Sequence, residues 1–365
     1  MNLGTLKAWV GALVPAAAML ALAAAPGDAS AQKKFDDVEI TIATFPSTWE
    51  IRFREEVGPA MEDMGIKMKF IGGNSEAFLA QLIAAKGKTP FDVVEITDHV
   101  FADLMEGEFL EKLDLANIPN VEFLNPSMYD DHRVGYWSTQ AAIVWNWEAF
   151  DERGIPHPNE IEDLLHPGLE GKVIFPTLSS YLAIPHIVAL AHKYGGSEAD
   201  IDPALPALRK FADQVHSFAN FTPMAQAMKN GDIIASLTVG NGAIRILDAG
   251  VPMAVRHISI RGKTGVPSFG YLGKVKGTKH PEAVEAFINA AIGWEMQEGS
   301  HVNNGVIPTH AEVLAKYAPQ QRKDKFGTYF NMMEPEKVNA MYYMAFDKMD
   351  RRAWGKKLQR VQAGK

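Results

Sequence analysis

Aromatic and hydroxyl side chains occur together where apolar runs of the sequence give way to polar segments. In "TFPSTWE" (44–50), Trp49 stands beside hydroxyls and a carboxylate directly after the apolar run 38–43. Such a mixture can bind a small molecule, because an aromatic face supplies apolar contact or attracts a cation while hydroxyls donate hydrogen bonds. The alternative is that Trp49 closes the end of a hydrophobic core.

Motifs typical of enzymes are absent from the sequence. It contains no Gly-x-Ser-x-Gly, no His-Glu-x-x-His and no phosphate-binding glycine-rich loop. The histidines are dispersed, and His186 and His192 lie six residues apart rather than the three or four that place two ligands on one helix face. The adjacent acids Asp130 and Asp131 are interpreted as solvated surface. We therefore expect no catalytic residue, no metal site and no cofactor.

The N-terminus is typical of an exported protein. A single lysine precedes the apolar stretch 8–25, and Ala29-Ser30-Ala31 forms a small-x-small cleavage site, so residues 1–31 are interpreted as a signal peptide removed before Gln32. An uncleaved anchor is the alternative, since the stretch is long and contains Pro15. We expect a soluble protein in a bacterial periplasm.

Composition narrows the classes of partner. The chain has 365 residues, a formal net charge of −8 and no cysteine, so no disulfide and no cysteine-linked lipid is expected. A mildly acidic chain with scattered basic residues argues against nucleic acid as a partner.

The elements that must position these side chains alternate between strand-like and helical segments. This spacing predicts an α/β fold of mostly parallel sheets flanked by helices. In such sheets ligands bind beyond the carboxyl ends of strands, which would bring several polar segments together in one cleft. The expected strands include 38–43, 66–73, 91–96, 171–176 and 233–239, and the expected helices include 49–64, 75–86 and 180–194.

A series of segments carries a resemblance through its order and spacing, among them "TPFDVVEITDHVFADLMEGEFLEKLD", "LLHPGLEGKVIFP" and "NGDIIASLTVGNGAIRILDAGVPMAVRH". Over nearly the whole mature chain the sequence resembles the extracellular solute-binding proteins of ABC importers, in the branch with polyamine, ferric-ion and phosphonate binders. The resemblance implies two lobes of type II, joined by two crossing hinge strands, that close on one ligand molecule. It also implies a monomer that delivers its ligand to permease subunits in the membrane, powered by a separate ATPase.

The expected division of the chain follows from this resemblance and from the change of pattern near residue 141. We expect a signal peptide at 1–31, lobe 1 at 32–141 and 256–305, lobe 2 at 142–255, and a C-terminal helical segment at 306–365 that packs across the lobes.

The polar segments at the strand ends supply the expected ligand-binding residues. We expect helices to begin near Ser180, at Thr97 or Asp98, and at Thr48. Free N–H groups at a helix N-terminus bind carboxylate or phosphate oxygens, so these three positions are candidate anion contacts. This pattern favours an anion or a zwitterion. The expected ligand-binding residues are Trp49, Thr48, Thr97, Asp98, Trp137, Ser138, Ser179, Ser180, Tyr181, Asn241 and Tyr271.

Three alternatives stay open. Polyamine binders of this branch resemble the chain, but they carry acids where this sequence has Pro176–Tyr181 and a tryptophan where it has Gly240. A diammonium ligand buried without counter-charges would lose several kcal/mol per ion, and only Glu50, Glu95 and Asp98 could supply them. A ferric binder is less favoured, because the adjacent pair Tyr342-Tyr343 lies in a C-terminal segment expected to be core. Outside transport, the alternative is a periplasmic hydrolase.

Overall fold

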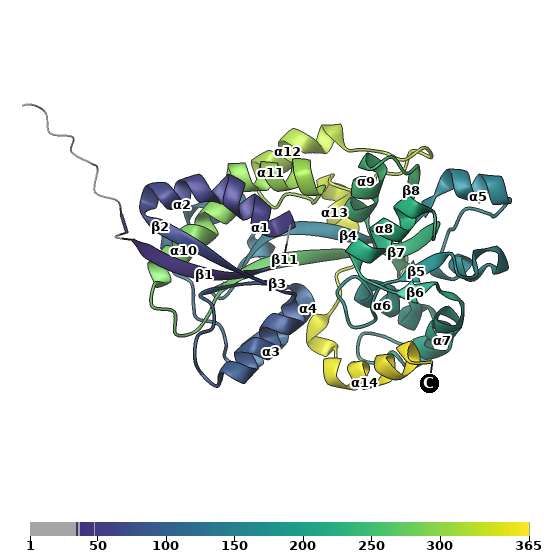
Figure 1. Cartoon of the computed structure of the whole chain (residues 1–365), viewed down its shortest axis with the longest axis horizontal. Helices are drawn as coiled ribbons and strands as arrows, with labels where there is room; N and C mark the ends of the chain where they lie inside the picture. Colours follow the sequence, from purple (N-terminus) through teal and green to yellow (C-terminus); the bar gives the residue numbers. More distant parts are fainter. Residues whose placement is uncertain (1–33, 36, 47, 365) are drawn as a thin grey trace, which may run out of the picture.

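The computed structural model describes residues 34–35, 37–46 and 48–364. The predicted signal peptide lies outside this part of the chain. Two α/β lobes stand side by side and are linked by long strands (Figure 1). The expected α/β, two-lobed fold is therefore confirmed, although both sheets are mixed rather than mainly parallel.

Lobe 1 is built on the parallel strands β2 (Ile66–Gly72), β1 (Val38–Thr44) and β3 (Val93–Thr97), followed by the antiparallel strand β11 (Pro267–Lys274). Side chains of β1 alternate between the two faces, as a strand requires. Ile40 and Ile42 pack on one face with Phe53 and Phe287, whereas Ala43 packs on the other with Phe78. Helices thus cover both faces of this sheet.

Lobe 2 pairs β5 (Val173–Phe175) in parallel with β6 (Ser217–Phe218) and β7 (Ala235–Val239), while β7 and β8 (Met253–His257) pair antiparallel with β4 (Val134–Asn146). Its two faces also hold separate hydrophobic clusters. Trp145 and Phe175 belong to one cluster, and Val144 and Ile174 to the other. A two-stranded ribbon, β9 (Ser259–Ile260) and β10 (Lys263–Thr264), completes the strands.

The strand β4 belongs to both lobes. Its first half, through Gln140, pairs with β11 in lobe 1, and its second half, from Ala141, pairs with β7 and β8 in lobe 2. Every residue of β4 from Val134 to Trp145 is buried. β4 and β11 are the two crossing strands, and a backbone bridge joins Ser138 of β4 to Ile307.

The helices have the following bounds. The α-helices are α1 (Thr48–Arg52), α2 (Gly58–Met64), α3 (Ser75–Ala85), α4 (Asp98–Glu106), α5 (Trp147–Arg153), α6 (Ile184–Lys193), α7 (Leu205–Gln214), α8 (Phe221–Asn230), α9 (Gly240–Asp248), α10 (Pro281–Ala291), α11 (Trp294–Asn304), α12 (Ala311–Tyr317), α13 (Pro335–Ala340) and α14 (Arg351–Gln362). A π-helical turn, η1 (Phe53–Val57), joins α1 to α2. The 3-10 turns are η2 (Leu115–Asn117), η3 (Pro119–Phe123), η4 (Pro126–Met128), η5 (Ile161–Leu165), η6 (Pro167–Leu169), η7 (Asp202–Ala204), η8 (Ala318–Gln320) and η9 (Phe346–Lys348).

The largest difference from the sequence prediction among these helices concerns α6. The helix expected from Ser180 begins at Ile184, and the residues before it form turns. Pro185 occupies the first turn of α6, where its missing N–H costs nothing, so it marks the true start. The expectation that Ser180 opens a helix was therefore wrong.

The C-terminal segment returns to lobe 2. Trp354, Leu358 and Val361 on one face of α14 are buried in the same cluster as the sheet of lobe 2. At the start of α14, Arg351 forms an ion pair with Asp103 of α4 in lobe 1. The domain limits expected from the sequence stay predictions, but this segment contacts both lobes.

No helix of the described part of the chain has the length and apolar character needed to cross a membrane.

Replacing Leu358 by alanine tests the contribution of α14 to the core of lobe 2. Because Leu358 is only 4% exposed, the truncation leaves a cavity and should lower the free energy of unfolding by about 2–5 kcal/mol. Lys356→Ala, at an exposed position of the same helix, is the control and should change it by less than about 0.5 kcal/mol. Equal effects in a chemical denaturation experiment would contradict the assignment of α14 to the core.

Candidate functional site

A cavity of about 540 Å³ lies between the lobes. Lobe 1 contributes the ends of β1 and β2 with the first turns of α1 and α3, and lobe 2 contributes the end of β7 with the first turns of α8 and α9. The lining residues are Phe45, Pro46, Thr48, Trp49, Gly73, Asn74, Ser75, Glu76, Ala77, Trp137, Thr139, Ser180, Tyr181, Leu182, Asn220, Phe221, Thr222, Pro223, Val239, Asn241, Gly242, Arg245, Asn304 and Val306.

The structure brings six of the residues expected from the sequence to this cavity. They are Thr48, Trp49, Trp137, Ser180, Tyr181 and Asn241. Their role as ligand contacts stays a prediction, but they share one hollow although they lie far apart in the sequence. The other five lie elsewhere, for reasons that the local packing gives.

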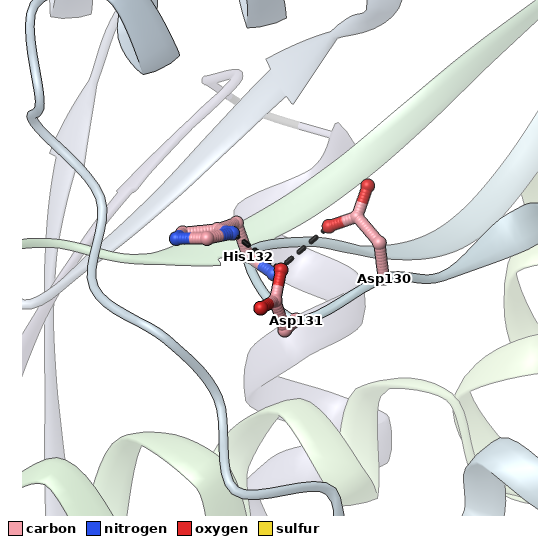
Figure 2. A group of neighbouring side chains, drawn as sticks. All are labelled: Asp130, Asp131 and His132. Carbon is pink, nitrogen blue, oxygen red and sulfur yellow. Dashed lines mark hydrogen bonds and ion pairs between the residues drawn. The ribbon is translucent and has the colours of Figure 1, made fainter.

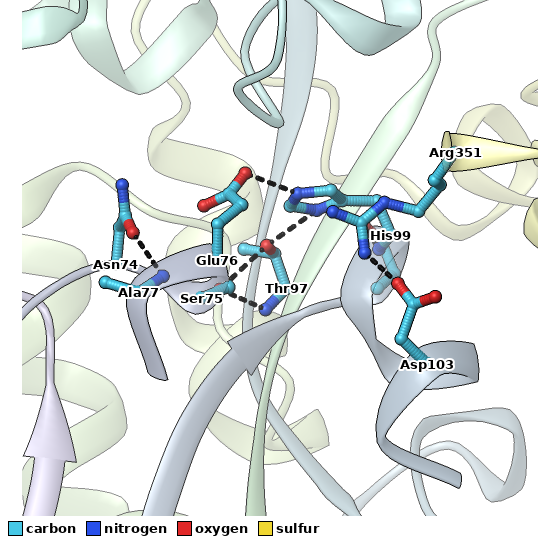
Figure 3. Close-up of polar contacts among 9 residues, drawn as sticks. Asn74, Ser75, Glu76, Ala77, Thr97, His99, Asp103 and Arg351 are labelled. Carbon is cyan, nitrogen blue, oxygen red and sulfur yellow. Dashed lines mark hydrogen bonds and ion pairs between the residues drawn. The ribbon is translucent and has the colours of Figure 1, made fainter. Parts of the chain in front are cut away.

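Thr97 and Asp98 point into the interior of lobe 1, where each forms hydrogen bonds with residues of that lobe. Thr97 exchanges hydrogen bonds with Ser75 and His99 (Figure 3), and Asp98 accepts hydrogen bonds from the backbone N–H groups of His99 and Phe269. Burial raises the pKa of Asp98 to about 7. Both residues do begin α4, but α4 does not reach the cavity.

Tyr271, Ser138 and Ser179 are also outside the cavity lining. Tyr271 is 5% exposed and its ring packs against the guanidinium of Arg133. Ser138 lies in the buried crossing strand β4, and Ser179 lies beside α14 in a separate groove.

Helix N-termini face the cavity; one of them, the start of α1 at Thr48, was expected from the sequence, and the others belong to helices that were not selected. The residues that open α3, α8 and α9 all line it. A helix N-terminus carries partial positive charge and N–H groups without intrahelical partners, so it favours an anionic group. Because the three helices come from both lobes, an anion between them would interact with each.

Aromatic rings form one wall of the cavity. Trp49 stacks on Trp137 with 5.5 Å between ring centroids, and Tyr181 lies 6.3 Å from Trp137. Trp49 is half-buried, and its ring also contacts Tyr136 edge-on at 5.1 Å. Trp49 therefore both packs on the core of lobe 1 and faces the cavity, which combines the two readings that the sequence left open.

A buried carboxyl group lies behind this wall. Glu95 is 0% exposed and accepts hydrogen bonds from the hydroxyls of Thr44 and Tyr136 and from the backbone N–H of Phe45. The indole N–H of Trp137 lies 3.4 Å from its Oε1. Burial raises the pKa of Glu95 to about 7, while these donors act to lower it. Glu95 thus holds the aromatic wall in place without lining the cavity.

Two charged side chains line the cavity, and neither was selected from the sequence. Glu76 accepts a hydrogen bond from His99 at 2.9 Å, and Arg245 lies 4.6 Å over the ring of Phe221 with a weak hydrogen bond of 3.4 Å to Thr48. Arg245 has no carboxylate partner among the described residues. The sequence gave Glu76 no distinguishing signal, since an acid in the first turn of a helix is common.

The side chain of Asn304 also lines the cavity and has no partner. Asn304 is 3% exposed, and neither its amide nitrogen nor its amide oxygen bonds to any described residue. The hydroxyl oxygen of Ser180 is unpartnered as well. Because buried polar groups are normally hydrogen-bonded, these atoms are available to a bound solute.

Asp130, Asp131 and His132 form a small cluster in the turn before β4 (Figure 2). Asp130 pairs with Arg133, and Asp131 pairs with Lys112 and His132. Their carboxylates are thus already neutralised, and nothing further marks a metal site there.

A sequence model of bacterial extracellular solute-binding proteins matches residues 57–327. The chain belongs to the bacterial extracellular solute-binding protein family. A comparison with curated protein sequences gives no significant match.

Several solved structures have the same fold. A spermidine/putrescine ABC transporter from Listeria monocytogenes is 14% identical with a TM-score of 0.72, covering 90% of this chain and 99% of its own. The binding protein MotA from A. tumefaciens B6, in complex with glucopine, is 19% identical with a TM-score of 0.70, covering 89% and 100%. An ABC transporter from Clostridium perfringens is 19% identical with a TM-score of 0.65, covering 88% and 99%. At these identities the likeness concerns the fold.

Glu95→Gln should change the pH dependence of stability. The pKa of Glu95 rises from 4.5 to about 7 on folding, so the folded state holds the proton more tightly and the wild type loses stability as the pH rises through this window. Between pH 5 and pH 8 the variant should therefore gain about 3 kcal/mol relative to the wild type, measured by denaturation at each pH. A difference that does not vary with pH would show that Glu95 is ionised throughout.

Proposed function

We propose that this protein is the periplasmic solute-binding component of an ABC importer. It captures a small organic solute with an anionic group between its two lobes and delivers it to permease subunits in the membrane, which a separate ATPase drives. The family and fold support solute binding for transport. We propose an anionic solute because the Arg245 side chain lines the cavity.

Arg245 is a cation placed where a solute would be enclosed. It extends from α9 of lobe 2 and reaches Thr48 of lobe 1, so it spans the gap between the lobes. A guanidinium binds a carboxylate or a phosphate through two parallel N–H donors. The first turns of α3, α8 and α9 add the positive ends of three helix dipoles to the same hollow.

The two-lobed construction supports capture by closure. β4 and β11 cross between the lobes, and a small change of their backbone angles would move one lobe relative to the other. Apolar enclosure by Trp49, Trp137 and Phe221 would remove the solute from water and strengthen its contact with Arg245.

A polyamine is less compatible with this cavity. Among the described residues Glu76 is the single acid that lines it, whereas two ammonium groups would require more counter-charge and would face Arg245. A tryptophan at position 240, as in the polyamine binders, would not fit, because a Cβ atom there would lie 1.7 Å from the carbonyl oxygen of Phe330. A catalytic role is not proposed.

A thermal-shift screen tests the proposed function. Carboxylates, amino acids, aminophosphonates, diamines and ferric citrate are added to the purified mature protein. A true ligand at 100 times its Kd should add about 2.7 kcal/mol to the free energy of unfolding and raise the Tm. We expect carboxylate-containing solutes to stabilise the protein, and stabilisation by diamines or ferric ion alone would contradict the proposal.

Trp49→Ala tests the aromatic wall. Loss of one apolar contact should weaken binding of the stabilising solute by about ten-fold or more, because such a contact contributes roughly 1–3 kcal/mol. Trp147→Ala is the matched control, since Trp147 is a half-buried tryptophan of lobe 2 outside the cavity. A collapse of the Tm of Trp49→Ala with unchanged affinity, measured by titration calorimetry, would show that Trp49 serves the core alone.

A further inference from the structure

A chain of hydrogen bonds fixes the position and charge of Glu76 (Figure 3). The Ser75 hydroxyl oxygen accepts from the backbone N–H of Thr97, and its proton is directed to the Thr97 hydroxyl oxygen at 3.1 Å. Thr97 in turn donates to Nδ1 of His99 at 2.9 Å, so the ring proton of His99 resides on Nε2 and is donated to Glu76 at 2.9 Å. This is the arrangement in which every member of the chain has a partner.

The surroundings favour the neutral form of His99 and the ionised form of Glu76. Burial lowers the pKa of His99, whose side chain is 0% exposed, and this effect exceeds the opposite effect of the neighbouring Glu76 carboxylate. Burial acts to raise the pKa of Glu76, but the hydrogen bond from His99, a backbone hydrogen bond and nearby positive charge together outweigh it, so the pKa of Glu76 lies below its usual value. Glu76 is therefore a fixed negative charge at the edge of the cavity.

The second oxygen of Glu76 remains available to a solute. Glu76 Oε1 accepts from His99, and no side chain of the described residues donates to Oε2. The side chain of Glu76 is 31% exposed and lines the cavity. On the lobe 2 side, Arg245 has no partner of opposite charge among the described residues. The unpartnered amide of Asn304, at the end of α11, adds a donor and an acceptor.

We propose that the cavity selects a zwitterionic solute, whose ammonium group binds Glu76 of lobe 1 and whose carboxylate or other acidic group binds Arg245 of lobe 2. Asn304 would bond the polar atoms between the two groups. This inference rests on the proposed function and specifies its solute as a compound of the amino acid type.

The cost of burying charge is the reason that both groups are required. When the lobes close, an ionised side chain without a partner loses its hydration, which costs several kcal/mol. A simple carboxylate would satisfy Arg245 and leave Glu76 unpaired, whereas a diamine would do the reverse. A zwitterion pairs both charges and also links the two lobes.

Titration calorimetry on the purified mature protein tests this inference with matched probes. The probes are α-amino acids and ω-amino acids of increasing chain length. Each is compared with the carboxylate that lacks its amino group and with the diamine that has an amino group in place of its carboxylate. We expect at least one amino acid to bind about ten-fold or more tightly than its matched carboxylate and its matched diamine.

Variants assign the two ends of the solute. Glu76→Gln should weaken binding of the amino acid about ten-fold and leave binding of the matched carboxylate nearly unchanged. Arg245→Met should weaken both. Glu50→Gln is the control, because Glu50 is a lobe 1 carboxylate that pairs with Arg54 outside the cavity lining. Thermal unfolding without solute verifies that each variant is folded.

His99 is tested as a positioning residue. His99→Leu removes the donor to Glu76 and should weaken binding of the amino acid but not of the carboxylate, whereas His99→Gln retains a donor and should restore part of the loss. A merely structural role would weaken both probes equally.

The contrary outcomes separate the two proposals. Equal binding of carboxylates and amino acids, with no effect of Glu76→Gln, would overturn the zwitterion and leave the solute-binding function intact. Binding of diamines alone would overturn the anionic group as well. Absence of binding by every probe class would overturn both the zwitterion and the anionic solute on which it rests.

Discussion

The arrangement of the whole molecule depends on one strand that two sheets share. β4 passes through the centre of the molecule, and each half of it completes the hydrogen bonding of a different lobe. Neither lobe can be displaced far without breaking backbone pairs of a buried strand, which is unfavourable because unpaired buried N–H and C=O groups lose hydrogen bonds. The cavity therefore has a floor of fixed position, from which Trp137 and Thr139 extend.

Buried polar residues support the residues that line the cavity. The aromatic rings of Trp49 and Trp137 form the surface that a solute would meet. Behind them lies the fully buried Glu95, which accepts a hydrogen bond from the indole N–H of Trp137. Glu76 is oriented in the same manner by His99. Glu95 and His99 do not line the cavity, but each fixes the position of a residue that does. Rigid binding sites are commonly built with such supporting residues.

The sequence predicts the α/β class, the two lobes and the approximate position of most strands, because apolar periodicity and strand–helix alternation are strong signals. It predicts which segments end near the cavity, but not which way each side chain faces. Thr97 ends β3 and Asp98 begins α4, as expected, yet both side chains point into lobe 1, since the direction at a strand end depends on packing that no local pattern records. Ser180 was assigned to a helix start because serine caps helices often, although Pro185 gave the better signal.

The residues that the sequence analysis missed have ordinary local patterns. Glu76 resembles a common first-turn acid, and its role emerges only when His99, distant in sequence, donates to it. Asn304 ends a helix before a glycine, as asparagine often does, and only the fold shows that its amide is buried without a partner. Long-range pairing of this kind is outside the reach of periodicity and spacing.

The location of α14 bears on when such a chain can finish folding. Lobe 1 draws its core from segments that end by Val306, whereas lobe 2 incorporates Trp354, Leu358 and Val361 from the last turns of the chain. A chain that is threaded across a membrane from its N-terminus would complete the second core only after nearly all of it has emerged on the far side. Completion of the lobe 2 core on the near side, before threading, is thereby disfavoured by the order of the sequence.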